Sequence, residues 1–182
     1  ADLAGTRQPT RIDNRPGANG IIATQAFIRT PADGYTVLIA TNTTHAANEH
    51  LYKKIPYDPV RDFTAITALA RGGQVMIVHP RVPAKKVKDF IALAKSQPGK
   101  LHFASGGVGT GLHMSGELLK LAAGINMVHV PYKGAGPGMT ALLAGEVNLM
   151  FNGVSAALPQ VKAGKIRALA ISTAQRSPLL PD

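Results

Sequence analysis

Short apolar runs alternate with helix-like segments between residues 75 and 171, and this alternation limits the chain to one class of fold. Hydrophobic periodicity predicts, in order, strand 75–78, helix 87–95, strand 101–104, helix 112–122, strand 127–130, helix 137–143, strand 147–151, helix 156–162 and strand 166–171. Glycine stands between a helix and the next strand at four places, where a helix C-terminus favours positive φ: Gly99, Gly124, Gly145 and Gly164. Helices of about ten residues between strands are typical of βαβ crossovers, so the sequence predicts an α/β fold with a mostly parallel sheet.

Residues 1–72 carry fewer regular signals. Strands are expected at residues 10–13, 35–41 and 63–70, and helices at residues 19–27, with Asn19 as the cap, and 46–53. The run 35–41, YTVLIAT, is nearly continuous in β-favouring side chains, which indicates a strand buried on both faces. The glycine pair at 72–73 marks a boundary, so we predict a partial first lobe at residues 1–72, a second α/β lobe at 73–173 and the start of a return crossing at 174–182.

A glycine-rich loop follows the strand expected at residues 101–104 and leads directly into a helix. The glycines from Gly106 to Gly111 prevent regular structure, and helical spacing resumes after them. The first N–H groups of such a helix have no partner within it, and the helix dipole adds about half a positive charge there, so the loop suits an anion. Ser105 and Thr110 can add hydroxyl donors. Glycines also occur in strand-to-helix turns for geometry alone, and both interpretations stand at this point.

Three more specific uses of a glycine loop are excluded by neighbouring residues. A phosphate-binding P-loop requires Gly-Lys-Ser/Thr, and no lysine follows these glycines. A dinucleotide site requires an acidic residue about 20 positions further on, where this chain has His129, Val130 and Pro131. A serine-hydrolase elbow requires glycine two residues before the serine, and Phe103 stands two residues before Ser105.

The carboxyl ends of parallel strands share one edge of a sheet, so three loops of the second half should gather there: 105–110, 131–136 and 152–155. They offer hydroxyls, backbone N–H groups, an amide, the phenol of Tyr132 and the ammonium group of Lys133, and they contain no carboxylate. This donor set suits a carboxylate or similar anion rather than acid–base catalysis, which needs a tuned pair of groups. A polar loop at 42–45 follows the strand expected at 35–41 and is either a ligand loop or a plain helix cap.

The formal net charge of +10 raises the question of nucleic acid, which basic clusters bind through phosphates. The longest basic runs are the pairs at 53–54 and 85–86, and aromatic residues do not interleave with basic ones, so no nucleic-acid partner is predicted. No run of about 18 apolar residues is present, so no membrane span is predicted. The absence of cysteine agrees with an oxidising compartment but excludes no other.

An enzyme is the alternative, because His113 and Glu117 lie one helical turn apart and could both reach a metal ion. No third ligand is evident, and such a pair is more often an exposed ion pair, so neither a metal nor a cofactor is predicted. His102 and His129 fall in expected strands, where a hydrogen-bonded sheet residue is the simpler interpretation. The alternative function is therefore an α/β enzyme that acts on a small anionic substrate.

Six motifs follow one another along essentially the whole chain. They are NRPGANG (14–20), PADGYTVLIAT (31–41), LYKKIPYDPVRDF (51–63), FASGGVGTGLHMSGEL (103–118), VHVPYKGAGPGMTALLAGEV (128–147) and RALAISTAQRSPLLPD (167–182). In this order they closely resemble the Bug-type solute receptors of tripartite tricarboxylate transporters. The resemblance implies a periplasmic binding protein of the type II class, whose two α/β lobes close on a small organic di- or tricarboxylate and deliver it to the membrane subunits of a transporter.

The resemblance also implies a set of ligand-binding residues, because such receptors hold carboxylates with backbone N–H groups and hydroxyls of strand-to-helix loops. Carried over position by position, the set is Thr41, Asn42, Thr43 and His45 in the first lobe and Ser105, Gly106, Gly107, Gly109, Thr110, His113, Tyr132, Lys133 and Asn152 in the second. Asn152 stands where the family commonly has an aspartate that accepts from a ligand amine or hydroxyl, a departure that counts against an amino-acid ligand.

The family pattern bears on the two ends as well. Family members begin with a further strand and a loop rich in proline and glycine, and they continue beyond residue 181 with a segment that returns to the first lobe. The first lobe is therefore expected to be incomplete, a partial sheet with an exposed edge and an uncovered core. We expect either a fragment of a longer protein or an assembly in which self-association covers this edge.

Overall fold

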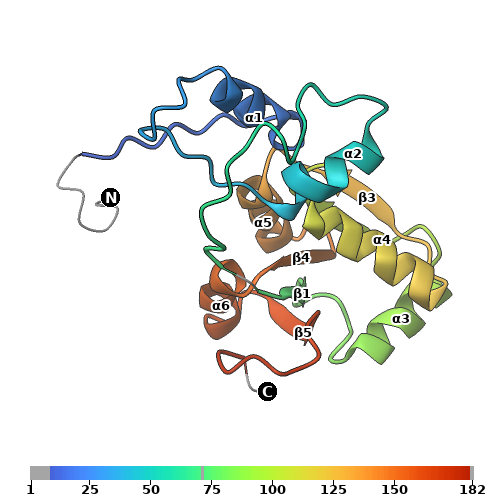
Figure 1. Cartoon of the computed structure of the whole chain (residues 1–182). Helices are drawn as coiled ribbons and strands as arrows, with labels where there is room; N and C mark the ends of the chain where they lie inside the picture. Colours follow the sequence, from blue (N-terminus) through green and yellow to red (C-terminus); the bar gives the residue numbers. More distant parts are fainter. Residues whose placement is uncertain (1–8, 71, 181–182) are drawn as a thin grey trace.

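The computed structural model describes residues 9–70 and 72–180, and a five-stranded sheet in the order β3-β2-β4-β1-β5 organises its second part (Figure 1). The strands are β1 Gln74–Val78, β2 His102–Ser105, β3 Val128–Pro131, β4 Leu149–Gly153 and β5 Arg167–Ile171. The helices between them are α3 Val87–Ser96, α4 Gly111–Ala123, α5 Ala135–Ala144 and α6 Val154–Lys162. Every element expected between residues 75 and 171 is confirmed, because each predicted end lies within two residues of the observed one.

Four strands run in one direction and β1 runs against them. β2 pairs in parallel with β3 and β4, whereas β1 pairs antiparallel with β4 and β5. The expectation of a mostly parallel sheet is confirmed, with β1 as the exception. An extended segment leads into β1, so no crossover helix imposes a parallel direction on this strand. Gln74, where β1 begins, consequently pairs with Gly153, where β4 ends. The chain therefore enters the sheet at the edge where the other strands finish.

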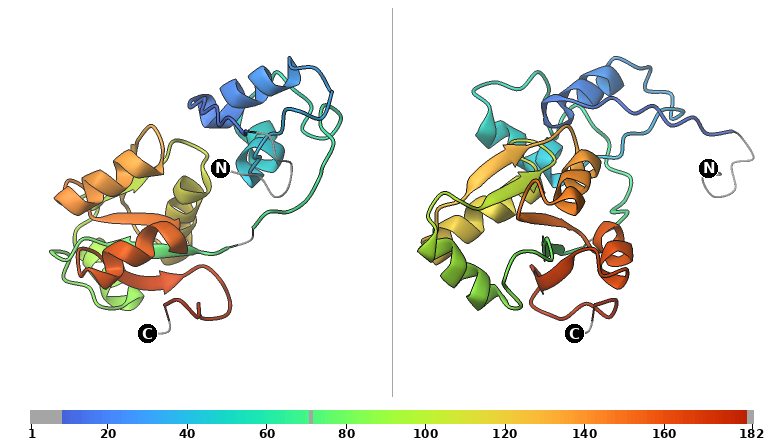
Figure 2. Two further views of the ribbon diagram at one scale, coloured as in Figure 1. Left: turned by 90° about the vertical axis from the view of Figure 1, so that its left-hand side faces the viewer. Right: turned by 180° about the vertical axis from the view of Figure 1, so that it is seen from behind.

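Helices cover both faces of the sheet, as the two views of Figure 2 show from different sides, and a layer of apolar side chains lies on each face. The layer under α3 and α4 includes Met76, Phe90, Phe103 and Leu119. The layer under α5 and α6 includes Val75, Ile77, Leu142 and Ala157. Successive side chains of β1 alternate between the two layers, as the two-residue period of a strand requires.

Two uses of glycine define how the helices lie on the sheet. A Cβ at Gly116 would overlap the ring of Phe103, so glycine at this position lets α4 lie close against β2. The helix C-termini end as predicted, since their glycines have φ of 74°, 60°, 77° and 68° at Gly99, Gly124, Gly145 and Gly164. The close packing on Phe103 brings the N-terminus of α4 and the glycine loop to the end of β2.

Residues 9–70 form two helical segments. One consists of η1 Ala18–Gly20 and α1 Ile21–Ile28, and the other of η2 Thr43–Ala47 and α2 Asn48–Leu51. The two expected helices are thereby confirmed, with the second shifted three residues toward the N-terminus at its start. The expected cap is wrong, because Gly20 takes the N-cap position of α1 without a side-chain hydrogen bond, and Asn19 has a left-handed conformation with φ of 53°.

The strands expected at residues 10–13, 35–41 and 63–70 are wrong. These residues pair with no described strand, and Tyr35, Ile39 and Ile66 are 82%, 77% and 79% exposed. A strand needs a neighbour for its backbone hydrogen bonds, and β-favouring side chains stabilise it only where they pack on a sheet. The described part of the chain offers neither here, which agrees with the expectation of an incomplete first lobe.

An extended segment, residues 63–70, leads from the first part to the sheet (Figure 2, left). The predicted lobe boundary at 72–73 lies at the end of this segment, beside residue 71, which is outside the described residues.

After β5 the chain turns, and Leu180 packs on the apolar layer under α5 and α6. Residues 181–182 of the predicted return crossing lie outside the described residues, and the lobe limits stay predictions. None of the described helices has both the length and the apolar character to cross a membrane.

Candidate functional site

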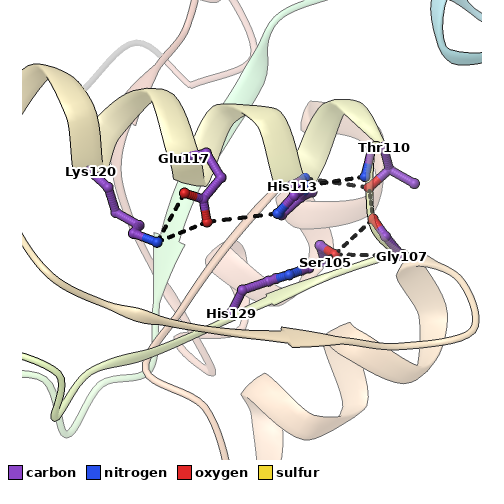
Figure 3. Close-up of polar contacts among 8 residues, drawn as sticks. Ser105, Gly107, Thr110, His113, Glu117, Lys120 and His129 are labelled. Carbon is purple, nitrogen blue, oxygen red and sulfur yellow. Dashed lines mark hydrogen bonds and ion pairs between the residues drawn. The ribbon is translucent and has the colours of Figure 1, made fainter. Parts of the chain in front are cut away.

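The glycine loop is held together by its own side chains. Ser105 is fully buried at the end of β2, and its Oγ accepts the N–H of Gly107 at 3.1 Å. Thr110 caps α4: its hydroxyl donates to the Gly107 carbonyl at 2.8 Å and accepts the N–H of His113 at 3.4 Å (Figure 3). The two hydroxyls that were expected to bind a ligand therefore shape the loop.

The unused donors of this region lie on the backbone. Helix α4 begins at Gly111, so the N–H groups of Gly111 and Leu112 have no carbonyl partner within the helix. Gly107 and Gly109 have φ of 129° and 83°, a left-handed range that favours glycine, so the loop takes a conformation that other residues rarely adopt. The dipole of the 13-residue helix adds partial positive charge at the same place. Backbone groups thus make this corner suitable for an anion.

Two histidines lie beneath the loop, with ring centroids 4.0 Å apart. Nδ1 of His113 accepts the N–H of Gly109 at 3.0 Å, and Nε2 of His129 lies 2.6 Å from Ser105 Oγ. Burial lowers the pKa of His113 more than nearby Glu117 raises it. Burial and the neighbouring His113 lower the pKa of His129 to about 4. Both rings are therefore neutral at physiological pH, and the partial positive charge at the loop comes from backbone N–H groups.

His113 and Glu117 form the expected i,i+4 pair, with Nε2 and Oε1 3.7 Å apart. Glu117 also pairs with Lys120, whose Nζ lies 2.9 Å from Oε2. Among the residues described, no three histidine and acidic side chains gather as a metal ion would require. This carboxylate is thus engaged with the Lys120 ammonium and the neutral His113 ring of its own helix.

The loop after β3 lies directly beside the glycine loop. The N–H of Tyr132 donates to the Ser105 carbonyl at 3.0 Å, and the N–H of Gly134 donates to the Gly106 carbonyl at 3.2 Å. Tyr132 is half-buried and Lys133 is exposed. Because two backbone hydrogen bonds join the loops, the predicted residues of both occupy the same edge of the sheet.

Asn152 reaches this edge from β4. It is 5% exposed, its Oδ1 accepts the N–H of Gly153 at 2.8 Å, and its Nδ2 lies 4.0 Å from the sulfur of Met150. A thioether is a weak acceptor, so the N–H₂ group of Asn152 makes no strong hydrogen bond among the described contacts. Asn152 is consequently a predicted residue with a buried and weakly bonded amide donor at this edge.

The predicted first-lobe residues surround the start of the helical segment η2. Thr41 and Asn42 are exposed, and Thr43 is 8% exposed. His45 is turned toward the interior of this part, where its Nδ1 lies 2.9 Å from Thr44 Oγ1 and its ring packs edge-on against Phe63 with centroids 4.6 Å apart. Thr41 and Asn42 are therefore better placed than His45 to reach a ligand.

A residue that the sequence analysis did not assign to the site connects the two parts. The side-chain amide of Asn19 donates to the carbonyl of Val108 in the glycine loop, and the backbone carbonyl of Asn19 accepts a hydrogen bond from Nδ2 of Asn48 at 3.2 Å. A Cβ at Gly109 would lie 2.7 Å from Asn19 Nδ2, which shows how closely the two parts approach. The Asn-Gly pair at 19–20 is the local signal for this residue, because such pairs often mark a left-handed turn.

A hollow of about 240 Å³ lies at the opposite edge of the sheet. His79, Arg81, Leu93, Gln97 and Asn148 are among its lining residues. None of the predicted ligand-binding residues lines it. The second-lobe candidates instead share the glycine-loop edge, and Asn19 links that edge to the part that contains Thr41–His45.

Comparison with known proteins identifies relatives of the same type. BugT of Bordetella pertussis is 33% identical over 96% of this chain and 54% of its own length. A structure of Rpa4515 from R. palustris with adipate is 38% identical and superposes with a TM-score of 0.88 over 91% of this chain and 56% of that chain. The periplasmic binding protein BugD is 32% identical, with a TM-score of 0.82 over 93% of this chain and 56% of that chain.

These comparisons confirm the resemblance noted in the motifs and the fold class. The chain spans about half the length of the curated relatives it matches. It therefore corresponds to part of the two-lobed fold of those proteins. Residues 4–182 match the model of the tripartite tricarboxylate transporter family receptor, and the chain belongs to that family.

Proposed function

We propose that this chain is the ligand-binding part of a periplasmic solute receptor, which binds a small organic carboxylate and delivers it to the membrane subunits of a tripartite tricarboxylate-type transporter. The observation that carries the proposal is the edge where β2 ends and α4 begins. Backbone donors are concentrated there, and the nearby carboxylate of Glu117 is paired with Lys120. The adipate in the related Rpa4515 structure supports a dicarboxylate as the ligand class.

One carboxylate of the ligand would be bound at the start of α4. The N–H groups of Gly111 and Leu112 are available there, and the amide of Asn152 lies at the same edge. Hydrogen bonds from such donors to a charged acceptor contribute about 1.5–3 kcal/mol each. Three of them would hold an anion without a cationic side chain, which agrees with neutral His113 and His129.

The other end of the ligand would be bound from the first part. Thr41 and Asn42 are exposed just before η2, where the first backbone N–H groups of that helical segment have no partner within it. Asn19 lies between this segment and the glycine loop, with its amide on the Val108 carbonyl. We infer that the side-chain amide of Asn19 leaves the Val108 carbonyl when the ligand binds. Its N–H₂ group then donates to a carboxylate of the ligand from the first-lobe side.

An enzyme is disfavoured by the same contacts. The pair that the enzyme alternative would use, His113 and Glu117, is engaged, because His113 Nδ1 accepts the Gly109 N–H and Glu117 pairs with Lys120. Nδ1 of His113 is therefore occupied as an acceptor, and Lys120 offsets the charge of the Glu117 carboxylate. We therefore propose a non-catalytic role for the chain.

Isothermal titration calorimetry of the chain with adipate and a panel of di- and tricarboxylates at pH 8 tests the proposal. Heat of binding with a stoichiometry of one is the expected result for at least one member of the panel. Absence of binding to every carboxylate overturns the proposal.

A pair of glycine variants separates the site from general stability. Gly107→Ala and Gly164→Ala each place a Cβ at positive φ, at 129° and 68°, but only Gly107 belongs to the loop. We expect Gly107→Ala to weaken binding about tenfold or more, which corresponds to about 1.4 kcal/mol. Gly164→Ala should leave the affinity unaltered, and an equal loss in both variants would contradict the assignment of the site.

Assembly is a separate part of the proposal. Tyr35, Val37 and Ile39 are exposed in one extended run, which supports pairing with a strand of another chain or segment. Analytical ultracentrifugation of the chain at increasing concentration measures this. A monomer at all concentrations would contradict self-association and leave the ligand proposal intact.

A further inference from the structure

The bonds of His113 determine which of its nitrogens carries the proton. The N–H of Gly109 donates to Nδ1 at 3.0 Å, so Nδ1 is unprotonated. A neutral ring then carries its proton on Nε2, which faces Glu117 Oε1 at 3.7 Å. Gly109 is thus held by an acceptor that exists only while the His113 ring is neutral.

The bonds of Ser105 make the same argument for His129. Ser105 Oγ accepts the N–H of Gly107, and its single proton has two acceptors within reach, Nε2 of His129 at 2.6 Å and the Gly107 carbonyl at 3.1 Å. We take the hydroxyl to donate in the 2.6 Å contact, so that Nε2 of His129 is unprotonated; donation from Nε2 to Oγ would instead direct the hydroxyl proton to the Gly107 carbonyl. His129 therefore orients the hydroxyl that holds the N–H of Gly107.

The two histidines share one environment (Figure 3). Their rings stack with centroids 4.0 Å apart, and the ring of Phe103 stacks on His129 at 4.9 Å. His113 comes from α4 and His129 from β3, so the pair joins two elements beneath the loop. Each ring holds one loop residue: His113 holds Gly109 directly, and His129 holds Gly107 through Ser105.

We propose that His113 and His129 are positioning residues, whose neutral pair holds the glycine loop in its carboxylate-binding form and whose protonation in acid releases the ligand. This inference rests on the proposed function. A protonated His113 would present a donor at Nδ1 to the N–H donor of Gly109, so the loop would have to move. A second positive charge on His129 would lie within a stacked pair whose centroids are 4.0 Å apart, which disfavours the arrangement further.

Glu117 and Lys120 are the other charged groups that face the pair. Glu117 favours protonation of both rings, and Lys120, with Nζ 2.9 Å from Glu117 Oε2, opposes it. Burial is the largest effect at both histidines and lowers both pKa values, that of His129 to about 4. Both rings are neutral above the ordinary histidine pKa of about 6.5, and the loop is expected to lose its support as the pH falls below that value toward 4.

Side-chain replacement at His113 tests the positioning role at pH 8 with adipate as the probe. His113→Leu leaves the Gly109 N–H without an acceptor, and we expect about tenfold weaker binding by calorimetry. His113→Asn places Oδ1 near the former position of Nδ1 and should recover most of the loss. Unimpaired binding in His113→Leu, or no recovery in His113→Asn, overturns the inference.

The opposite edge of the sheet provides a matched control. His79 also accepts a backbone N–H at Nδ1, from Arg81 at 3.2 Å, but lies beside the hollow away from the glycine loop. His79→Leu removes the same kind of bond and should leave adipate affinity and its pH dependence unaltered. A loss equal to that of His113→Leu would mean that the effect is general destabilisation, and would overturn the inference.

The pH dependence is measured as the ratio of the affinity of the native protein to that of a variant at each pH. This ratio cancels the protonation of adipate itself in acid. We expect the native protein to lose at least about twofold more affinity than the double variant His113→Asn/His129→Gln between pH 7 and pH 4, since half of His129 is protonated near pH 4 and the double variant has no imidazole beneath the loop. Thermal unfolding at each pH verifies that both proteins are folded. A ratio that does not vary with pH overturns the inference.

Nitrogen chemical shifts of the imidazoles give a readout that needs no ligand. At pH 7 we expect Nδ1 of His113 and Nε2 of His129 to be unprotonated, with the proton on the other nitrogen of each ring. The opposite tautomers overturn the inference. If the native protein binds no carboxylate at pH 8, the proposed function fails, whereas these tautomers still report whether the pair holds the loop as described.

Discussion

Residues 35–39 and 74–78 have similar β-favouring sequences and very different environments. Val75 and Ile77 of β1 are 1% and 0% exposed, whereas Tyr35 and Ile39 are 82% and 77% exposed. β1 lies between β4 and β5 and is hydrogen-bonded on both sides, while residues 35–39 have no strand neighbour in the described part of the chain. β-propensity therefore produced a strand only where a sheet supplied backbone partners and a covered face.

The two parts also differ in how many apolar side chains they bury, and therefore in how much they contribute to the stability of the fold. Both apolar layers belong to the part that contains the sheet, and Phe90, Phe103 and Leu149 are fully buried there. In residues 9–70 the buried side chains include several polar ones, such as Thr24, Thr44 and Asn48. The comparison predicts that substitutions in the two parts differ in cost by several kcal/mol even where the side chains are alike.

The largest effect is expected for Phe103→Ala. Its ring lies against Gly116 in the apolar layer under α3 and α4, so truncation leaves a cavity and should lower the free energy of unfolding by about 3–5 kcal/mol. Urea unfolding measures the change. Ile39→Ala is the matched substitution in the first part and should cost less than about 0.5 kcal/mol, because its side chain is 77% exposed. Similar costs at both positions would remove the contrast between the two parts.

Two helix glycines should respond in opposite directions. Gly116→Ala forces a Cβ into the Phe103 ring and should destabilise the fold by about 1–3 kcal/mol in spite of the better helix propensity of alanine. Gly136→Ala in α5 meets nothing within 4 Å and should stabilise by about 0.5 kcal/mol. Stabilisation by both changes would show that α4 can move away from β2, and that the packing of the second part is looser than described.

The dependence of stability on pH should be smaller and belongs to the histidine pair. Because burial lowers the pKa of His113 and His129 in the folded state, the unfolded chain binds protons more readily, and the stability present above about pH 6.5 decreases as the pH falls toward 4. Between pH 7 and pH 5 we expect a loss of about 1 kcal/mol after allowance for solvent screening of these half-buried rings. The double variant His113→Asn/His129→Gln should lose less, and an identical pH profile would exclude the pair as the cause.

The smallest effect is expected for Val37→Pro. Residues 36–40 lie outside any described strand, so the substitution removes an N–H group that no sheet uses and should change the free energy of unfolding by less than about 0.5 kcal/mol. In a central strand the same change would remove a ladder hydrogen bond and cost about 1–3 kcal/mol. A cost of that size would mean that residues 35–41 do pair as the sequence predicted, and would end the distinction between this run and β1.

Part of the site could be predicted because its signals are local. Ser105, Gly107, Gly109 and Thr110 follow a strand and precede a helix in sequence, so their place at one edge follows from the order of elements. Asn19 could not be placed in this way, since its contact with Val108 spans 89 residues. The bond between Ser105 and His129 spans 24 residues and depends on β2 and β3 being neighbours. Contacts of that range are decided by packing, which no local pattern records.

The sequence by itself determined the helices and strands between residues 74 and 171, because side-chain periodicity and the left-handed glycines act within a few residues of one another. Only the tertiary structure decided the strand order, the reversed direction of β1, the stacking of His113 on His129 and the exposure of residues 35–41. Each of these depends on which surfaces are available to pack or to pair. A β-favouring run without such a partner remains extended and exposed, whatever its own residues prefer.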